Sequence, residues 1–179
     1  NLLNALGAIA ISLSHGIKVT VIQEVLAQFQ GVARRFEVSE VVNKSTVFTL
    51  INDYGHHPAE IKTTLKTIRL AYPDRRIVHL FQPHRYSRTS EHFEAFIDAL
   101  SDADQRVVLK TYAASEKPAE GIDAETLANA LSNQGSTCHY ACDHKKAEQM
   151  LKSFVNDKDV VLIQGAGDVN QIVPRLKCW

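Results

Sequence analysis

The sequence predicts a Rossmann-like α/β domain with a mainly parallel sheet covered by helices on both faces, preceded by a short helical segment. Near-continuous apolar strands alternate with amphipathic helices through most of the chain, which is typical of parallel sheets buried on both faces. Two strands separated only by Asn43 and Lys44 predict a hairpin at the start of this sheet. The first 30 residues show helical periodicity alone. We therefore expect two parts, residues 1–30 and 31–179, with a boundary near Gly31.

The predicted elements follow one another as two helices, a hairpin, and then alternating helices and strands. Apolar residues at helical spacing predict the helices at 1–15 and 20–29, and alternation predicts the hairpin strands at 36–42 and 45–53. Pro58 stands at a favoured first helical position. The remaining predicted elements are helix 58–72, strand 76–81, helix 90–100, strand 106–112, helix 124–133, strand 136–142, helix 145–155 and strand 159–164.

Composition and charge exclude several classes of protein. Of the 179 residues, 45% are hydrophobic and 22% are charged, which is ordinary for a soluble globular protein. The formal net charge is zero, so long-range attraction to nucleic acid or to an anionic membrane is not expected. No apolar run approaches the ~20 residues of a membrane span. We expect a cytoplasmic protein with no nucleic-acid or membrane partner.

The stretch CHYACDH (138–144) is the one segment that resembles a metal site, with two cysteines and two histidines. Its alternating pattern predicts a strand, in which Cys138 and Cys142 would lie ~13 Å apart at ~3.3 Å per residue. One tetrahedral ion could not bind both thiolates at that separation. Three cysteines, an odd number, also do not indicate a disulfide framework. We expect no metal site in this chain.

Two polar segments follow successive predicted strands at the point where each strand ends. NDYGHHPAEI (52–61) follows the second hairpin strand, and FQPHRYSRT (81–89) follows the next strand along the chain. Ligands of open α/β sheets bind at the carboxyl ends of the strands. If the two strands neighbour each other, the side chains after them form one polar pocket, made by Tyr54, His56, His84, Arg85 and Arg88.

The two arginines of the second segment suit an anion. Arg85 and Arg88 are three residues apart, so both can face one ligand with bidentate geometry if the following helix begins early. The structural alternative is that His57 caps its helix, Asp53 shapes the turn and Arg88 is a solvated surface residue. Because two such segments occur at successive strand ends, we favour the pocket.

Two further segments leave alternatives open. GAGDVN (165–170) has the first two glycines of a dinucleotide fingerprint but Asn170 in place of the third, and a tight turn explains it equally well. Arg34 and Arg35 form either a phosphate clamp or ordinary linker charge. No GxxxxGK[ST] loop occurs, so the sequence contains no recognised cradle for a nucleoside triphosphate.

Taken together, NDYGHHPAEI, LFQPHRYSRT, GVARRFE, NLLNALGAIA and VVLIQGAG resemble the Mur ligases of peptidoglycan synthesis. The resemblance implies three domains: one for a UDP-sugar, a central ATPase domain, and a Rossmann-like carboxy-terminal domain that receives the amino acid. Residues 1–30 resemble the tail of the central ATP-binding domain, and residues 31–179 resemble the carboxy-terminal domain. This segment alone is not expected to turn over without the N-terminal and central domains.

The resemblance also implies an activity. It is greatest to the ligases that join L-alanine to UDP-N-acetylmuramate with ATP through an acyl phosphate, forming ADP. Mg²⁺ is implied as well, with ligands mainly in the other domains. Tripeptide-recycling relatives usually carry Phe-Ala where this chain has Tyr54-Gly55, which favours L-alanine. A tripeptide-recycling ligase and a non-catalytic anion- or nucleotide-binding module remain as alternatives.

Roles for the nucleotide-binding residues are implied by position in these motifs. Asn1 and Asn4 resemble the asparagines that contact adenine, Asp53 the ribose contact, and Arg35 the arginine that meets the ATP phosphates. The chain departs from the family at Ser115, where members usually carry glycine, so the conformation of the loop YAASEKP (112–118) is open.

Roles near the incoming alanine and the reacting phosphate are implied for Tyr54, His56, His84, Arg85 and Arg88. Of these, the two histidines and the two arginines are expected to be catalytic. We expect Arg88 to anchor the carboxylate of the amino acid and Arg85 to stabilise the phosphate, although the two roles could be exchanged.

Overall fold

A computed structural model describes residues 2–29, 31–43, 46–118, 121–135 and 137–179. The chain divides into two compact units, Asn1–Val32 and Ala33–Trp179. No helix in these described ranges is long and apolar enough to cross a membrane.

The first unit consists of two helices, α1 (Leu2–Ser14) and α2 (Val19–Gln28). Gly16 adopts a positive φ of 75° directly after α1, and its N–H donates to the carbonyl of Leu13. Neither helix contains a buried residue. Both helices predicted from periodicity are therefore present, and their apolar side chains stay exposed in this unit.

The second unit contains a six-stranded sheet in the order β1-β2-β6-β3-β4-β5. The strands from β2 to β5 along this order are parallel, and β1 pairs with β2 antiparallel as the predicted hairpin. The strands are β1 (Glu37–Asn43), β2 (Thr46–Asp53), β3 (Ile77–Phe81), β4 (Gln105–Leu109), β5 (Cys138–Ala141) and β6 (Val160–Gln164).

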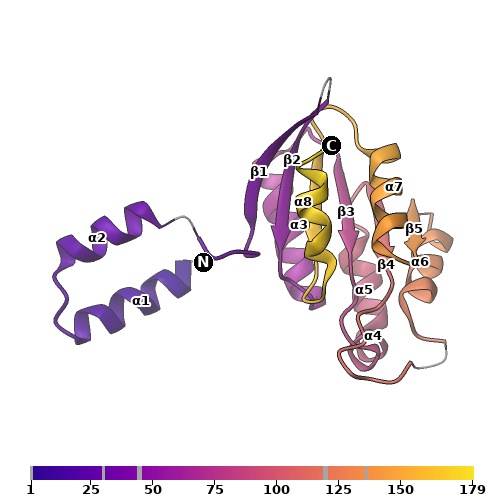
Figure 1. Cartoon of the computed structure of the whole chain (residues 1–179). Coiled ribbons are helices and arrows are strands. Elements are labelled where there is room, and N and C mark those ends of the chain that lie inside the picture. The colour runs from indigo at the N-terminus through magenta and orange to yellow at the C-terminus, as the bar shows by residue number, and fades with distance from the viewer. Residues whose placement is uncertain (1, 30, 44–45, 119–120, 136) are drawn as a thin grey trace. The chain divides into compact units, whose positions relative to one another are not determined.

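Helices cover both faces of the sheet, as the continuous apolar strands predict (Figure 1). One buried cluster joins the sheet to α3, α5 and α6, and a second joins it to α7, η1 and α8. The predicted Rossmann-like class is confirmed. These helices are α3 (Pro58–Ala71), α5 (Phe93–Leu100), α6 (Ala124–Asn133), α7 (His144–Phe154), the 3-10 helix η1 (Val169–Ile172) and α8 (Val173–Leu176).

The two strands that precede the polar segments, β2 and β3, are not neighbours in the sheet. β6, the last strand in the sequence, lies between β2 and β3. Gln164 of β6 pairs in register with Asp53 of β2 and with Phe81 of β3, so the three carboxyl ends are level. The two turns that carry the polar segments are therefore separated by one strand.

The helix predicted at 90–100 is in fact two helices, α4 (Tyr86–Glu91) and α5, which meet at His92. Apolar periodicity did not show α4 because its residues, YSRTSE, are mostly polar. The short helices η1 and α8 were not predicted, since four residues each are too few to show a helical period.

Candidate functional site

The turn after β2 is organised around the carboxylate of Asp53, which is buried. Its Oδ1 accepts a hydrogen bond from the backbone N–H of Phe36 at 3.0 Å. Its Oδ2 accepts bonds from the N–H of Gly55 at 3.1 Å, the hydroxyl of Thr64 at 3.2 Å and the amide of Gln164 at 2.8 Å. Four donors from three parts of the chain therefore fix this turn.

Gly55 is required by the same arrangement. A Cβ at this position would lie 2.7 Å from Asp53 Oδ2 and 2.7 Å from Gln164 Nε2, well inside van der Waals contact. No side chain fits there while the bond between Asp53 and Gln164 is kept. Glycine is needed at position 55 because the side chains of Asp53 and Gln164 lie so close to its backbone.

The start of α3 holds the two histidines of the turn in place. His57 caps the helix, its Nδ1 accepting the N–H of Ala59, and Glu60 completes a capping box. Glu60 Oε2 accepts the backbone N–H groups of His56 at 2.9 Å and His57 at 3.0 Å. Burial opposes ionisation of Glu60, but these bonds outweigh it and hold its pKa below the ordinary value. The capping alternative for His57 is therefore observed.

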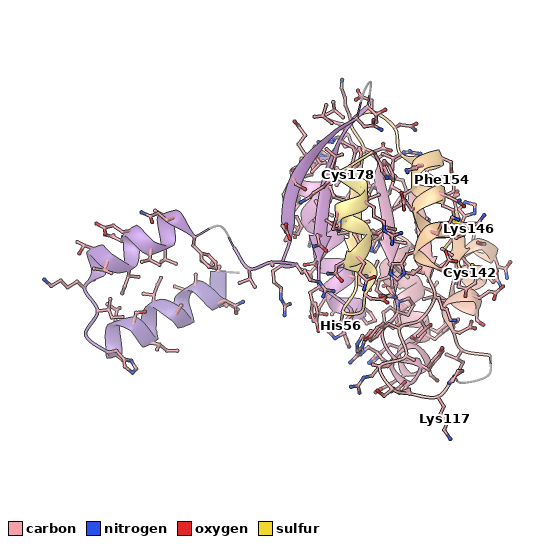
Figure 2. The ribbon with its side chains drawn as sticks, in the orientation of Figure 1. His56, Lys117, Cys142, Lys146, Phe154 and Cys178 are labelled. Atoms are coloured by element: carbon pink, nitrogen blue, oxygen red, sulfur yellow. The ribbon has the colours of Figure 1, made fainter. Side chains whose placement is uncertain are left out.

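Glu60 also lies 3.7 Å from Nδ1 of His56, so the carboxylate that caps the helix faces the imidazole that the sequence singles out. His56 has the ring of Tyr54 on one side, edge-on at 5.5 Å between centroids. Its place at the lower edge of the sheet, beside the start of α3, is seen in Figure 2.

The turn after β3 is built differently. Arg85 is exposed and adopts a left-handed φ of 75°, which places it outside α4 at the position before the helix. Its N–H donates to the carbonyl of Tyr112 at 2.9 Å. Arg88 is half-buried, and its Nη1 donates to the carbonyl of His84 at 3.0 Å and lies 3.2 Å from His84 Nδ1.

The two turns meet even though β6 separates their strands. The ring of His56 lies 5.8 Å from the ring of His84. The expected proximity of the two polar segments is thus observed, with Arg88 held against His84. What these side chains bind stays a prediction.

The surroundings of His84 hold its pKa below the ordinary imidazole value, which favours the neutral ring at pH 7. Burial is the largest cause that lowers its pKa, followed by the positive charge of Arg88, the neighbouring His56 and the charge of Arg85, against a smaller opposing contribution from Glu116. A neutral imidazole can accept a proton from a bound group.

The two arginines at the start of the unit flank Tyr54. The guanidinium carbons of Arg34 and Arg35 lie 4.9 and 5.1 Å from its ring centroid. Arg34 Nη2 also donates to the carbonyls of Gly165 at 2.7 Å and Gly167 at 3.0 Å. Arg34 therefore ties the loop after β6 to the first turn, whereas Arg35 is exposed.

The glycines of GAGDVN serve tight packing. A Cβ on Gly165 would lie 2.9 Å from the carbonyl of Gln82, and one on Gly167 would lie 2.4 Å from its Oε1. The Gln82 amide fills this turn, accepting the N–H of Val169 at 2.9 Å and donating to Asp168 Oδ1 at 2.7 Å. The turn alternative accounts for the two glycines.

The loop after β4 has a backbone conformation at position 115 that suits glycine. Ala114 and Ser115 both adopt left-handed φ angles, of 47° and 72°, which glycine adopts without strain. Beyond them, the Glu116 carboxylate accepts the N–H and the hydroxyl of Ser87 at 3.0 and 2.6 Å, and these bonds hold its pKa below the ordinary value.

The other residues that the sequence singled out belong to the first unit or to β5 and the turn after it. Asn4 is exposed on α1, in the first unit, and Asn1 lies outside the described residues. Cys138 is buried in β5 and Cys142 is exposed beyond its end. Among the described residues, no group of three or more His, Cys, Asp and Glu side chains could hold a metal ion.

Sequence reasoning missed three residues of the site. Gln164 and Glu60 hold Asp53 and His56, and Tyr112 stacks on His84 at 5.4 Å with an interplanar angle of 17°. Tyr112 lies just beyond the end of a third parallel strand, β4. The strand-end rule, applied once more, would have found it.

Comparison with known proteins identifies the family. Residues 34–167 match the family model described as Mur ligase, glutamate ligase domain. The chain belongs to the Mur ligase family. The family is one of ATP-dependent ligases.

Individual relatives carry a more specific name. The chain is 44% identical over 178 residues to a UDP-N-acetylmuramate–L-alanine ligase from Hydrogenovibrio crunogenus, covering 96% of this chain and 38% of the relative. A ligase of the same name from Psychrobacter arcticus is 39% identical, covering 98% and 37%. The crystal structure of the UDP-N-acetylmuramate-alanine ligase from Thermotoga maritima aligns with a TM-score of 0.77 at 30% identity, over 98% of this chain and 36% of that one. The chain thus spans less than two fifths of the length of these relatives.

Proposed function

We propose that this chain is the carboxy-terminal, amino-acid-receiving part of a cytoplasmic ligase that joins L-alanine to UDP-N-acetylmuramate in peptidoglycan synthesis, forming ADP from ATP. Residues 1–30 would be the last helices of its central ATP-binding domain and residues 31–179 its carboxy-terminal domain. The observation that carries the proposal is the meeting of His56, His84 and Arg88 at one sheet edge, in a chain 44% identical to a ligase of that name.

The reaction places clear demands on such a site. ATP phosphorylates the muramoyl carboxylate, and the amine of L-alanine attacks the resulting acyl phosphate. A carbon–nitrogen bond forms, the bond between carbon and phosphate oxygen breaks, and the amine loses a proton. The site must hold the amine at the carbonyl, offer positive charge to carboxylate and phosphate, and exclude water.

The turn after β3 supplies the positive charge. Arg88 would bind the carboxylate of L-alanine, because its guanidinium is already held in place by the carbonyl and ring of His84. Arg85 is exposed and free to turn toward phosphate oxygens. A bidentate contact between guanidinium and carboxylate contributes about 2–3 kcal/mol.

The imidazoles would act on the amine. An ammonium group cannot attack a carbonyl, so a nearby base must take its proton. His84 is suited to this task because its lowered pKa favours the neutral ring at pH 7. His56, held by Glu60 and 5.8 Å from His84, would position the amine together with Tyr54.

Nucleotide contacts would come from the other end of the first turn. Arg35, beside the ring of Tyr54, would meet the ATP phosphates. Asp53 would contact the ribose through Oδ1, which accepts one internal bond whereas Oδ2 accepts three. Asn1 and Asn4 would contact adenine, and the ligands of Mg²⁺ would lie mainly in the domains outside this chain.

The proposal is tested by phosphate release from the full-length protein supplied with ATP, UDP-N-acetylmuramate and L-alanine. We expect release that depends on L-alanine. Release only with a tripeptide in place of L-alanine would make the protein a recycling ligase. No release with either would leave an anion- or nucleotide-binding module. The names of two curated relatives and the pair Tyr54-Gly55 support L-alanine.

A further inference from the structure

We propose that the ring of Tyr112 restricts the acceptor to a single amino acid, by closing the site on the side toward which a peptide would extend. The inference rests on the proposed function. Tyr112 lies beyond the carboxyl end of β4, at the same sheet edge as the two histidine-bearing turns.

Tyr112 is clamped to the turn after β3 by its backbone. Its N–H donates to the carbonyl of Pro83 at 2.9 Å, and its carbonyl accepts the N–H of Arg85 at 2.9 Å. Its ring stacks on His84, with centroids 5.4 Å apart. The ring is thus placed by the same backbone that places Arg85.

The ring is also packed against the loop after β6. A Cβ on Gly167 would lie 2.7 Å from Tyr112 Cγ and 2.8 Å from its Cβ, so this loop leaves no room between them. Tyr112 is 39% exposed, with His84 stacked on its ring and Gly167 against its Cβ and Cγ, so two sides of the side chain are covered and the rest faces solvent.

Beyond Tyr112 lies a depression of about 250 Å³. It opens at the carboxyl ends of β4 and β5, and Tyr112 forms part of its wall together with Lys110, Asp143, His144 and Asp168. His144 Nε2 lies 3.4 Å from Asp168 Oδ1. A lining with charges of both signs suits the amide and carboxylate groups of a peptide better than a hydrocarbon side chain.

The order of these groups defines the direction of extension. Arg88 contacts His84, His84 stacks on Tyr112, and Tyr112 borders the depression. In a peptide acceptor, the chain continues through the carboxyl carbon of the first residue, which is an amide carbonyl there instead of the carboxylate of L-alanine. With that carbon at Arg88, a second residue would pass His84 and meet the Tyr112 ring. Removing the ring would join the depression to the site.

The test compares two acceptors in the full-length protein, L-alanine and the dipeptide L-alanyl-L-alanine, by phosphate release. We expect Tyr112→Ala to raise the ratio of kcat/KM for the dipeptide to that for L-alanine at least tenfold. The matched control Tyr112→Phe keeps the ring and should leave the ratio within twofold of wild type. A thermal melt establishes that each variant is folded.

A second variant tests the route of the peptide. Cys142 lines the depression and is exposed, on the α7 side of the domain in Figure 2. Cys142→Trp should fill the depression. Combined with Tyr112→Ala, it should reverse the rise in the ratio of kcat/KM for the dipeptide to that for L-alanine. It should leave kcat/KM for L-alanine unchanged. If Tyr112→Ala does not fold, Tyr112→Leu gives the same comparison.

The outcomes separate the inference from the function on which it rests. A wild-type protein that uses L-alanine, with a ratio unchanged in the folded Tyr112 variants, overturns the inference and leaves the proposed function standing. A wild-type protein that uses the dipeptide as readily as L-alanine overturns the inference directly. No use of L-alanine by wild type overturns the proposed function, and the role of Tyr112 falls with it.

Discussion

The turns after β2 and β3 occupy equivalent places in the sheet but are ordered in different ways. In the first, the Asp53 carboxylate is buried and accepts four hydrogen bonds, while Glu60 and His57 cap the helix that follows. In the second, Arg85 is exposed in a left-handed conformation, and among the described residues the side chain of Arg88 is held by hydrogen bonds to His84 alone.

The first turn is built mainly for rigidity, and the second mainly for ligand binding. The Asp53 and Glu60 carboxylates of the first turn bond mainly to the protein itself, so their substitution should act on the free energy of unfolding. The cations of the second turn keep donors for a ligand, so its substitutions should act on substrate affinity. The following predictions test whether substitutions in the first turn change mainly stability and those in the second mainly substrate affinity.

Asp53→Ala should have the largest effect on stability. It removes the common acceptor of Phe36 N, Gly55 N, Thr64 Oγ1 and Gln164 Nε2. Each buried donor left without an acceptor costs about 1–3 kcal/mol, in part recovered by water, so we expect a loss of about 3–5 kcal/mol. Urea unfolding of the 179-residue chain measures it.

Asp53→Asn is the matched control, since the amide keeps one acceptor oxygen and the shape of the side chain. It should lose clearly less than the alanine variant. Equal losses for the two variants, or a loss below about 1 kcal/mol for alanine, would show that the hydrogen bonds of this turn do not hold it.

Arg88→Ala should show the opposite pattern. The free energy of unfolding should change by less than about 1 kcal/mol, because only hydrogen bonds of a half-buried side chain to His84 are lost. The KM for L-alanine in the full-length protein should rise by the equivalent of about 2–3 kcal/mol, and far more than the KM for ATP. Arg88→Lys keeps the charge without the fork and should fall between the two. Equal rises in both KM values would rule out the carboxylate contact.

Acid should weaken the support of the first turn through His79. This histidine is fully buried in β3, close to the Gln164 amide that bonds Asp53, and neither ring nitrogen has a hydrogen-bond partner of normal geometry among the described residues. Burial first, and then the charge of Arg106, lower its pKa to about 3, against a weaker opposing effect of Gln164.

The direction in which stability changes with pH follows from the pKa of His79 in the folded and in the unfolded chain. Because the pKa of His79 is lower in the folded chain than the unfolded value near 6.5, the unfolded chain takes up a proton first as the pH falls. The contribution of His79 to stability is complete above pH 6.5 and declines below it. We expect a loss of about 2 kcal/mol between pH 6.5 and 5. His79→Leu should remove this part of the pH dependence in urea unfolding, and an unchanged acid slope in that variant would exclude His79 as its source.

Periodicity and strand-end chemistry predicted most of this fold and part of the site. Alternation identified the hairpin, and continuous apolar strands identified the parallel sheet, because both patterns arise locally from which faces are buried. The strand order is not local. Nothing in the sequence of β6 indicates that it inserts between β2 and β3.

The same limit applies to individual residues. His56, His84 and Arg88 were found because they crowd together after strands. Gln164 was missed because it ends an otherwise apolar strand and bonds Asp53 across 111 residues of sequence. The sequence left the role of Arg34 open between a phosphate clamp and linker charge. Its bonds to the carbonyls of Gly165 and Gly167 could not be predicted because they depend on where β6 ends.

The insertion of β6 has a consequence for the order of folding. The strand that spaces the two turns leaves the ribosome after both of them, so neither turn can reach its final position before residues 160–164 have emerged. Contacts between distant parts of a sequence form slowly, since a long loop must close before they contribute. The nascent domain should therefore remain unable to bind substrate until β6 emerges, and a ribosome stalled before residue 160 should hold a chain with both motifs and no site.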